Sequence, residues 1–94
     1  MTLGKSQQTL LKFIITNPKS TVEDIHRGCF NDKLKKYTNN LLYENRRFFV
    51  IRDYFDNNSP DEYSIRIEEL KKEIDINYYI MTGDFITPKQ KQLL

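Results

Sequence analysis

Residues 20–51 read STVEDIHRGCFNDKLKKYTNNLLYENRRFFVI, and this stretch decides how the chain folds. It predicts two short helices joined by a turn and followed by a β-strand. Ser20 and Glu23 have the spacing of a capping box, in which each side chain satisfies a free backbone N–H near the start of a helix. We therefore expect a helix to start at Thr21 or Val22.

The turn and a second helix follow directly. Gly28 is expected to stop the first helix, and Asn31 can then cap the second one. Asp32 would stand in the first turn of the second helix, where the positive end of the helix dipole favours a carboxylate. This helix should run to about Asn45, a residue type that tolerates the left-handed conformation at a helix end. Residues 48–51 then predict a strand.

The second helix has an apolar side and a polar side when its residues are spaced at about 100° each. The apolar side carries Leu34, Tyr37, Leu41 and Leu42. The polar side carries Lys36, Asn39 and Tyr43, flanked by Lys33, Lys35 and Asn40. Thr38 lies nearer the apolar side. One side can therefore enter a core, and the other is left for a partner.

The chain has 94 residues, which is enough for one domain and too few for two. We therefore expect a single domain over residues 1–94 with its core at about 5–68. The net charge is +2, but residues 1–52 hold ten Lys and Arg against four Asp and Glu, whereas residues 53–94 hold five against nine. The positive charge lies with the two-helix stretch, which favours a polyanion-binding half. Ordinary solvation of a helix surface would explain the same lysines equally well.

A further helix and a β-hairpin are expected on either side of this stretch. Residues 5–17 carry a wide apolar stripe that ends before Pro18, since a residue before proline resists the helical conformation. Residues 46–55 and 62–68 predict two strands joined by turn-forming residues. Alternation places Arg52 and Arg66 on one side of the hairpin. The other side carries Phe49, Ile51, Phe55, Tyr63, Ile65 and Ile67.

The tip of this hairpin is acidic. It carries Asp53, Asp56, Asp61 and Glu62. Negative charge there would repel a nucleic-acid backbone, so we expect the arginines at the base of the hairpin to contact phosphates and the tip to stay away from them.

The segment at residues 67–82 fits either a helix or a strand. Helical spacing before Gly83 aligns Ile67, Leu70, Ile74, Tyr78 and Met81, whereas residues 74–80 also alternate as a strand would. We expect a helix, which would expose a second apolar face to a homodimer or another partner. That face carries Ile76, Tyr79 and Ile80. Alternatively, the last turn folds back and covers it. A short final helix over residues 88–94 follows from the start-of-helix residues Thr87, Pro88 and Gln90.

The residue types needed for catalysis or metal binding do not gather anywhere in the sequence. Cys29 is the only cysteine and His26 the only histidine, so one chain cannot build a tetrahedral metal site or an internal disulfide. We expect Cys29 to be a small core residue and His26 to lie on a helix surface. Phosphate-binding glycine loops and a nucleophile with an evident base are also missing. We therefore expect no enzyme activity, no cofactor and no metal.

The same composition bears on where the protein works. A single cysteine fits a reducing cytosol. Apolar runs stay well short of the roughly 18 residues that a membrane span needs. We therefore expect a cytoplasmic protein with no membrane partner.

Nucleic-acid recognition remains as the function that these residues can perform. The amides of Asn39 and Asn40 suit a bidentate contact with adenine, and lysine suits guanine or phosphate. The candidate base-reading residues are Lys36, Asn39, Asn40, Lys33 and Lys35, with Lys36 and Asn39 foremost. The candidate phosphate-binding residues are Arg46, Arg47, Arg52 and Arg66.

Taken together, STVEDI, NDKLKKYTNNLLYEN and the strand pair from Phe48 to Ile67 resemble the helix-turn-helix and wing of small prokaryotic and phage winged-helix DNA-binding proteins. The resemblance covers roughly residues 5–68. This superfamily includes repressor-like transcriptional regulators and the centromere-binding adaptors of plasmid and phage partition systems, whose partner is a tubulin-like GTPase. The resemblance implies a homodimer, a recognition helix from about Asp32 to Asn45 in the major groove, and tandem or palindromic sites on double-stranded DNA.

Two other functions stay open at this point. The domain could be a protein–protein interaction module, such as a phage protein that binds a host factor, with its lysines merely solvated. The acidic C-terminal half would suit a protein partner in either case. RNA binding ranks last, because the aromatic residues are expected to face the core and not to form a stacking platform.

Overall fold

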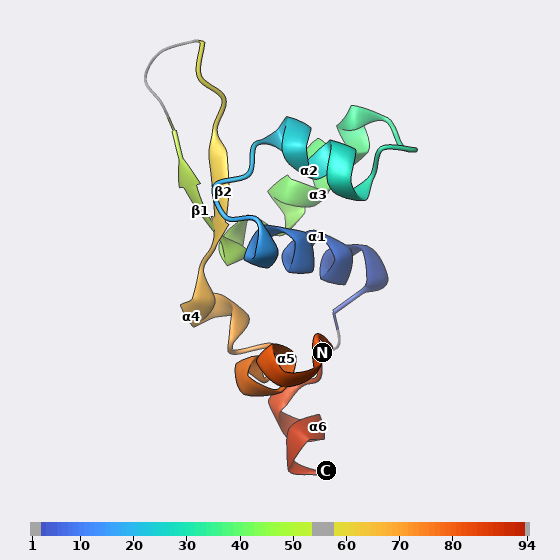
Figure 1. Cartoon of the computed structure of the whole chain (residues 1–94), viewed down its shortest axis with the longest axis vertical. Coiled ribbons are helices and arrows are strands. Elements are labelled where there is room, and N and C mark those ends of the chain that lie inside the picture. Colours follow the sequence, from blue (N-terminus) through green and yellow to red (C-terminus); the bar gives the residue numbers. More distant parts are fainter. Residues whose placement is uncertain (1–2, 54–57, 94) are drawn as a thin grey trace.

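The structure is a computed structural model that describes residues 3–53 and 58–93, and it has a small α+β fold (Figure 1). In chain order its elements are α1 (Lys5–Thr16), α2 (Val22–Cys29), α3 (Lys35–Glu44), the 3-10 helix η1 (Arg46–Phe48), β1 (Phe49–Arg52), β2 (Glu62–Ile65), α4 (Ile67–Leu70), α5 (Ile76–Thr82) and α6 (Pro88–Gln92). Helices α1, α2 and α3 lie beside the β1–β2 hairpin, and α4, α5 and α6 lead away from the hairpin tip (Figure 1). The molecule is elongated, with extents of 48 × 28 × 21 Å.

A small antiparallel sheet ties the middle of the chain to its start. β1 pairs with β2 in the register Phe49–Ile65, Val50–Ser64, Ile51–Tyr63 and Arg52–Glu62. On the other side of β2, Tyr63 donates its N–H to Ser20 at 2.7 Å and accepts the N–H of Ser20 at 3.1 Å. The segment between α1 and α2 is thereby fixed to the hairpin.

Both strands are shorter than the sequence predicts, because helical turns replace their outer ends. Residues 46–48 form η1, and Ile67 begins α4. Arg66 stands between β2 and α4 and still donates its N–H to the carbonyl of Phe48 at 2.7 Å. The predicted bounds of 46–55 and 62–68 are therefore wrong at these ends, although the hairpin itself is present.

The predicted apolar side of the hairpin is only partly buried. Phe49 is buried, and Tyr63 and Ile65 are half-buried against the core. Ile51 and Ile67 are 43% and 46% exposed. The prediction for Phe55, like that for Asp56 at the tip, lies outside the described residues.

One hydrophobic core holds the helices and the hairpin together. Its buried members are Leu10, Leu11, Ile14, Ile25, Phe30, Leu42, Phe48, Phe49, Leu70 and Ile74. Helix α1 supplies three of them, and Phe13 and Ile15 pack against the same core from its flanks. The wide apolar stripe of residues 5–17 thus forms the predicted helix, which ends at Thr16.

The start of α2 is capped by the pair next to the predicted one. Thr21 accepts a hydrogen bond from the N–H of Asp24, and the Asp24 carboxylate accepts one from the N–H of Thr21. The predicted capping residues make other contacts. The Ser20 hydroxyl donates to the Asn17 carbonyl, and Glu23 forms an ion pair with Lys35 of α3. Because the backbone of Ser20 is held by Tyr63, the capping position falls on the following residue.

Gly28 lies inside α2 and does not stop it. The helix continues to Cys29, and Phe30 forms its C-cap. A Cβ on Gly28 would stand 2.3 Å from Cε2 of Phe13, so the glycine lets α1 and α2 approach closely. Cys29 is half-buried against the core, and burial raises the pKa of its thiol.

Helix α3 starts later than predicted and has a different cap. Residues 30–34 form the connection from α2, and Lys33 donates its N–H to the carbonyl of Phe30 at 2.9 Å. Asn31 therefore caps nothing, and Asp32 precedes the helix. The N-cap is Leu34, which is 79% exposed and not part of the core.

The predicted C-terminal helix is two helices. Residues 71–75 separate α4 from α5, and Asp75 caps α5 by accepting the N–H of Tyr78 at 2.8 Å. Gly83 ends α5 in the left-handed conformation, with φ of 78°, as its position predicts. Thr87 and Gln90 form the predicted capping box of α6, which ends at Gln92.

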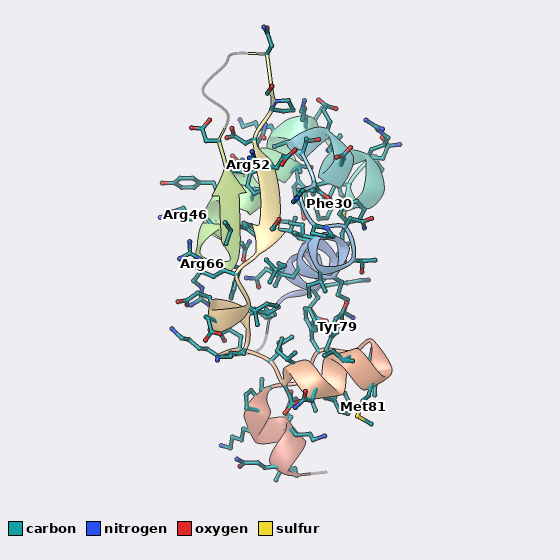
Figure 2. The ribbon with its side chains drawn as sticks, turned by 60° about the vertical axis from the view of Figure 1, so that its left-hand side comes forward. Phe30, Arg46, Arg52, Arg66, Tyr79 and Met81 are labelled. Carbon is teal, nitrogen blue, oxygen red and sulfur yellow. The ribbon has the colours of Figure 1, made fainter. Side chains whose placement is uncertain are left out.

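The predicted partner face on α5 is largely covered. Ile76 and Tyr79 pack against the core, and the rings of Tyr79 and Phe85 lie 4.9 Å apart. Figure 2 shows Tyr79 between α5 and α1, with Met81 on the far side of α5. Of the three predicted residues only Ile80, at 73%, is strongly exposed. The chain after Gly83 thus folds back, which is the alternative that the sequence left open. None of the helices in the described ranges is long and apolar enough to cross a bilayer.

Candidate nucleic-acid interface

Four of the five predicted base-reading residues lie on α3, and Lys33 stands just before it. Lys36, Asn39 and Asn40 are exposed, as are Lys33 in the preceding connection and Lys35 at the helix start. The opposite face is anchored, because Thr38 and Leu42 are buried at 0% and 2% exposure. The helix therefore presents its polar side without losing core contacts.

The five side chains differ in how freely they can reach a ligand. Lys35 forms an ion pair with Glu23 of α2. The Lys33 ammonium lies 6.0 Å from the centre of the Tyr37 ring. Lys36, Asn39 and Asn40 make no side-chain hydrogen bond or ion pair with any residue that the structure describes. These three are the ones available for a new contact.

A partly buried polar contact holds α3 against α2. His26 Nδ1 lies 2.7 Å from the hydroxyl of Thr38, which has no exposed surface. His26 was expected to be an ordinary surface residue, and the structure instead makes it a link between the two helices. The signal in the sequence was a threonine on the apolar side of a helix, whose hydroxyl needs a partner when buried.

Three of the four predicted phosphate-binding arginines lie along the hairpin. Figure 2 shows Arg46, Arg52 and Arg66 following the hairpin toward α4. All three side chains belong to exposed residues. Arg46 also donates to the carbonyl of Tyr43 at 2.8 Å, and its guanidinium lies 4.2 Å from the centre of the Tyr43 ring. Arg46 therefore joins the end of α3 to the start of the hairpin.

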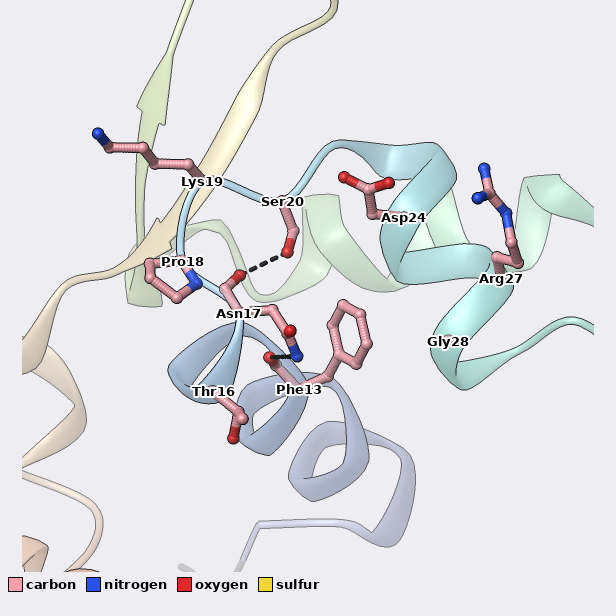
Figure 3. A pocket seen from close by; sticks show the side chains of 9 residues that line it. All are labelled: Phe13, Thr16, Asn17, Pro18, Lys19, Ser20, Asp24, Arg27 and Gly28. Carbon is pink, nitrogen blue, oxygen red and sulfur yellow. Dashed lines mark hydrogen bonds between the residues drawn. The ribbon is translucent and has the colours of Figure 1, made fainter.

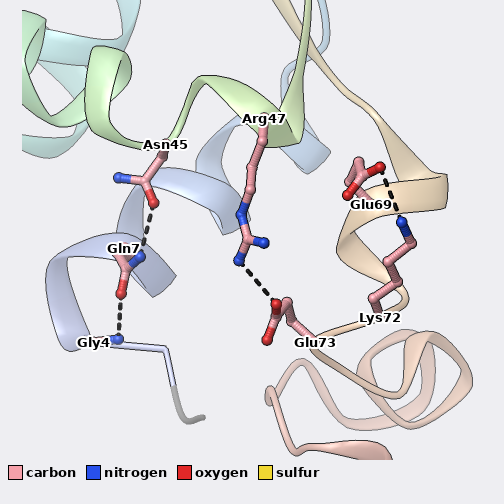
Figure 4. A network of polar contacts seen from close by, with 7 residues as sticks. All are labelled: Gly4, Gln7, Asn45, Arg47, Glu69, Lys72 and Glu73. Atoms are coloured by element: carbon pink, nitrogen blue, oxygen red, sulfur yellow. Dashed lines mark hydrogen bonds and ion pairs between the residues drawn. The ribbon is translucent and has the colours of Figure 1, made fainter.

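Arg47 points elsewhere. Its guanidinium donates to the Glu73 carboxylate at 2.8 Å and lies 4.4 Å from the centre of the Phe48 ring (Figure 4). A phosphate contact from Arg47 would first require the ion pair with Glu73 to open. The prediction for Arg47 is therefore the least supported of the four.

The same view shows how the end of α3 is fixed. Asn45 is buried and accepts a hydrogen bond from Gln7 of α1 at 2.8 Å (Figure 4). Its own amide donates to the carbonyl of Leu41. Its φ of −109° is not left-handed, so the prediction of a left-handed stop is wrong. Asn45 ends the helix by joining it to α1.

The acidic tip contains a pair of interacting carboxyls. Asp61 is half-buried, and this burial together with the adjacent Asp53, whose carboxyl hydrogen-bonds to it, raises the pKa of Asp61 above its ordinary value. Glu62 stands opposite Arg52 in the register of the hairpin. Glu62 is thus level with Arg52, whereas Asp53 and Asp61 lie next to this pair on the side of the tip.

Replacing Asp61 with asparagine is expected to stabilise the protein slightly at neutral pH. A carboxyl whose pKa is raised by folding stabilises the fold below its unfolded pKa, and this contribution is lost as the pH rises through the folded pKa. Asparagine mimics the protonated form, so the gain should vanish by about pH 3. Urea denaturation of both proteins across this pH range measures it. A gain that persists unchanged at about pH 3 would contradict the assignment to the Asp53–Asp61 pair.

An open pocket of about 580 Å³ lies between the end of α1 and α2 (Figure 3). It is lined by Phe13, Thr16, Asn17, Pro18, Lys19, Ser20, Asp24, Arg27 and Gly28. Lys19 has a φ of 63°, and Figure 3 shows its side chain directed away from Arg27. The two cations therefore do not converge on one ligand position.

Within residues 3–53 and 58–93, no group of three or more His, Cys, Asp or Glu side chains is placed to hold a metal ion. Comparisons with protein-family models, with curated proteins and with solved structures find no match to this chain. The candidate interface therefore rests on its own geometry and charge.

Proposed function

We propose that this is a winged-helix protein that binds double-stranded DNA, with α3 as the recognition helix in the major groove. The outward face of α3 carries the proposal: Lys36, Asn39 and Asn40 are exposed and available on a helix whose other side is buried. A helix presented in this way can enter the groove while the domain keeps its core. The order of elements supports the winged-helix assignment, because α1, the bridge at Ser20, α2, α3 and the hairpin follow one another as that fold requires.

The chemistry of the surface divides into base reading and phosphate binding. Asn39 and Asn40 can each make two hydrogen bonds to adenine, and Lys36 can donate to guanine. Lys33 and the hairpin arginines Arg46, Arg52 and Arg66 would hold the phosphates on either side, which position a protein without reading sequence. Lys35 and Arg47 would contribute after leaving their carboxylate partners. The acidic tip would stay off the backbone.

A protein of this kind would act in the cytoplasm as a transcriptional regulator or as a partition adaptor that binds a centromere. Both roles need DNA recognition without catalysis, and both commonly use two copies on repeated or palindromic sites. The acidic C-terminal half, residues 53–94, would offer the surface for a protein partner, and part of its negative charge lies at the hairpin tip.

DNA binding is expected to weaken steeply with salt. About five phosphate contacts would give a slope near −4.5 in a plot of log affinity against log salt, which is roughly a 500-fold loss between 50 and 200 mM. Fluorescence anisotropy of a labelled duplex, titrated at several salt concentrations, measures the slope. Arg46→Gln should reduce it by about 1, and Lys89→Gln in α6 should leave it unchanged. Absence of binding at about 50 mM salt would reject the proposed function and favour a protein-interaction module.

A further inference from the structure

One edge of the sheet is open. The strand order is Ser20, β2, β1, and among the described residues no strand pairs with the outer side of β1. The strand sequence Phe49-Val50-Ile51-Arg52 is rich in residues that favour β structure. An open edge of this composition is a site where another strand can add.

The hydrogen bonds of the hairpin show which backbone groups face outward. The N–H and the carbonyl of Tyr63 are both hydrogen-bonded to Ser20. Neither group therefore points at Ile51, the residue opposite Tyr63 in β1. Phe48 accepts from Arg66, which places the next hydrogen-bonded pairs of the hairpin at Val50 and Arg52 by alternation. The N–H and carbonyl of Ile51 therefore face the open edge, as does the carbonyl of Phe49.

Apolar side chains flank these groups on both faces of the strand. Val50 is 50% exposed and Ile51 is 43% exposed, and they point to opposite faces. Burial of β-branched side chains against a neighbouring strand is a main source of sheet stability. The edge thus offers both hydrogen bonds and apolar surface.

We propose that β1 pairs with β1 of a second copy of this chain, in antiparallel register centred on Ile51. In that register the two Ile51 residues exchange both of their outward hydrogen bonds across a two-fold axis. The carbonyl of each Phe49 accepts the N–H of Asp53 in the other copy. The two hairpins then form one four-stranded sheet. This proposal does not depend on DNA binding and is tested without DNA.

The side chains fit this register. Ile51 faces its own counterpart, and each Val50 faces Arg52 of the other copy, whose aliphatic stem can cover it. Phe49 faces Asp53. None of the positions in the paired strands places like charges opposite one another. This matters because like charges in directly opposite positions would destabilise the pairing of a strand with its own copy. The complementarity of the strand to itself favours a second copy over an unrelated peptide.

The C-terminal segment offers less to a second copy. Ile76 and Tyr79 are already packed against the core of their own chain. The residues that stay strongly exposed there, Ile80, Met81 and Leu93, lie on the separate helix α5 and at the end of α6. These residues also provide the matched control for the experiment.

Sedimentation velocity over a concentration series, without DNA, tests the proposal. The natural sequence should dimerise at or below about 100 µM, and Ile51→Pro should raise the dissociation constant roughly thirtyfold by removing one outward donor from each copy. Proline suits this position because the lost N–H faces the edge and not β2. Ile51→Lys should have a similar effect, and it serves if the proline variant does not fold. Ile80→Lys should leave the dimer intact.

Amide hydrogen exchange of the natural sequence gives a second readout. The N–H of Val50 is bound within the hairpin and should be protected at all concentrations, whereas that of Ile51 should become protected only as the dimer forms. A monomer throughout the concentration series would overturn the proposal. So would a dimer that Ile80→Lys dissociates and Ile51→Lys does not, or an Ile51 amide whose protection is independent of concentration.

Discussion

Replacing Phe48 with alanine is expected to lower the free energy of unfolding by about 3–5 kcal/mol. Phe48 is 1% exposed and stands where α3 passes into the hairpin. Its N–H donates to the Asn45 carbonyl, its own carbonyl accepts from Arg66, and the Arg47 guanidinium covers its ring. Truncation would leave a cavity between η1, α4 and the rest of the core, and such a cavity collapses poorly because its walls belong to different elements.

Urea denaturation followed by circular dichroism measures this loss. Domains of this size have a total stability of about 5–15 kcal/mol, so the alanine variant should be marginal or partly unfolded at room temperature. Phe48→Leu keeps most of the volume and should cost less than about 1.5 kcal/mol. Equal effects of the two substitutions, or a loss below about 1 kcal/mol for alanine, would show that the ring does not fill the centre of the core.

The sequence predicted those elements whose signals are local. Helix α1 has an apolar stripe and a proline directly after it, and both depend only on neighbouring residues. The capping box of Thr87 and Gln90 and the end of a helix at Gly83 are likewise local, and both were predicted correctly. From Lys36 onward the apolar and polar sides of α3 were also correct, except that Tyr37 is 37% exposed, because the helical period fixes them once the helix exists.

The errors arise where distant residues decide. Ser20 had the right spacing for a cap, but its backbone is hydrogen-bonded to Tyr63, far along the chain. The N-cap is therefore the next residue, Thr21. The break between α4 and α5 depends on a hydrogen bond from the N–H of Asp75 to the carbonyl of Ile86 at 2.8 Å. A periodic apolar pattern crosses that break without interruption, so periodicity alone predicts one helix.

The position of the candidate site could be predicted from the sequence. Whether each of its side chains is free or held in an ion pair could be predicted less well. Exposure of Lys36, Asn39 and Asn40 follows from the helical period, and the structure places them as expected. The ion pairs of Lys35 with Glu23 and of Arg47 with Glu73 could not be foreseen, since each joins residues of different elements. The tertiary structure therefore decides which cations remain available to a phosphate. The two ion pairs lower the expected number of phosphate contacts.

Replacing Lys36 and Asn39 together with alanine is expected to weaken binding to a specific duplex by roughly 100-fold or more. Each good base contact contributes about 1–3 kcal/mol of discrimination, and every 1.4 kcal/mol is about tenfold in affinity. The two residues are exposed and make no side-chain hydrogen bond or ion pair with the described part of the chain, so their removal should leave the fold intact. A duplex selected from a random pool by the natural protein provides the site, and anisotropy measures both affinities.

The size of the loss has to be compared with that of a variant that removes charge without removing base reading. Arg66 lies along the hairpin. Arg66→Ala should weaken binding to selected and random duplexes by the same factor, because phosphate contacts carry no sequence information. The Lys36 and Asn39 variant should instead lose most of the difference between the two duplexes. If it weakens both equally, α3 contacts only the backbone. If it changes neither, α3 is not the recognition helix, and the hairpin arginines would have to carry the binding alone.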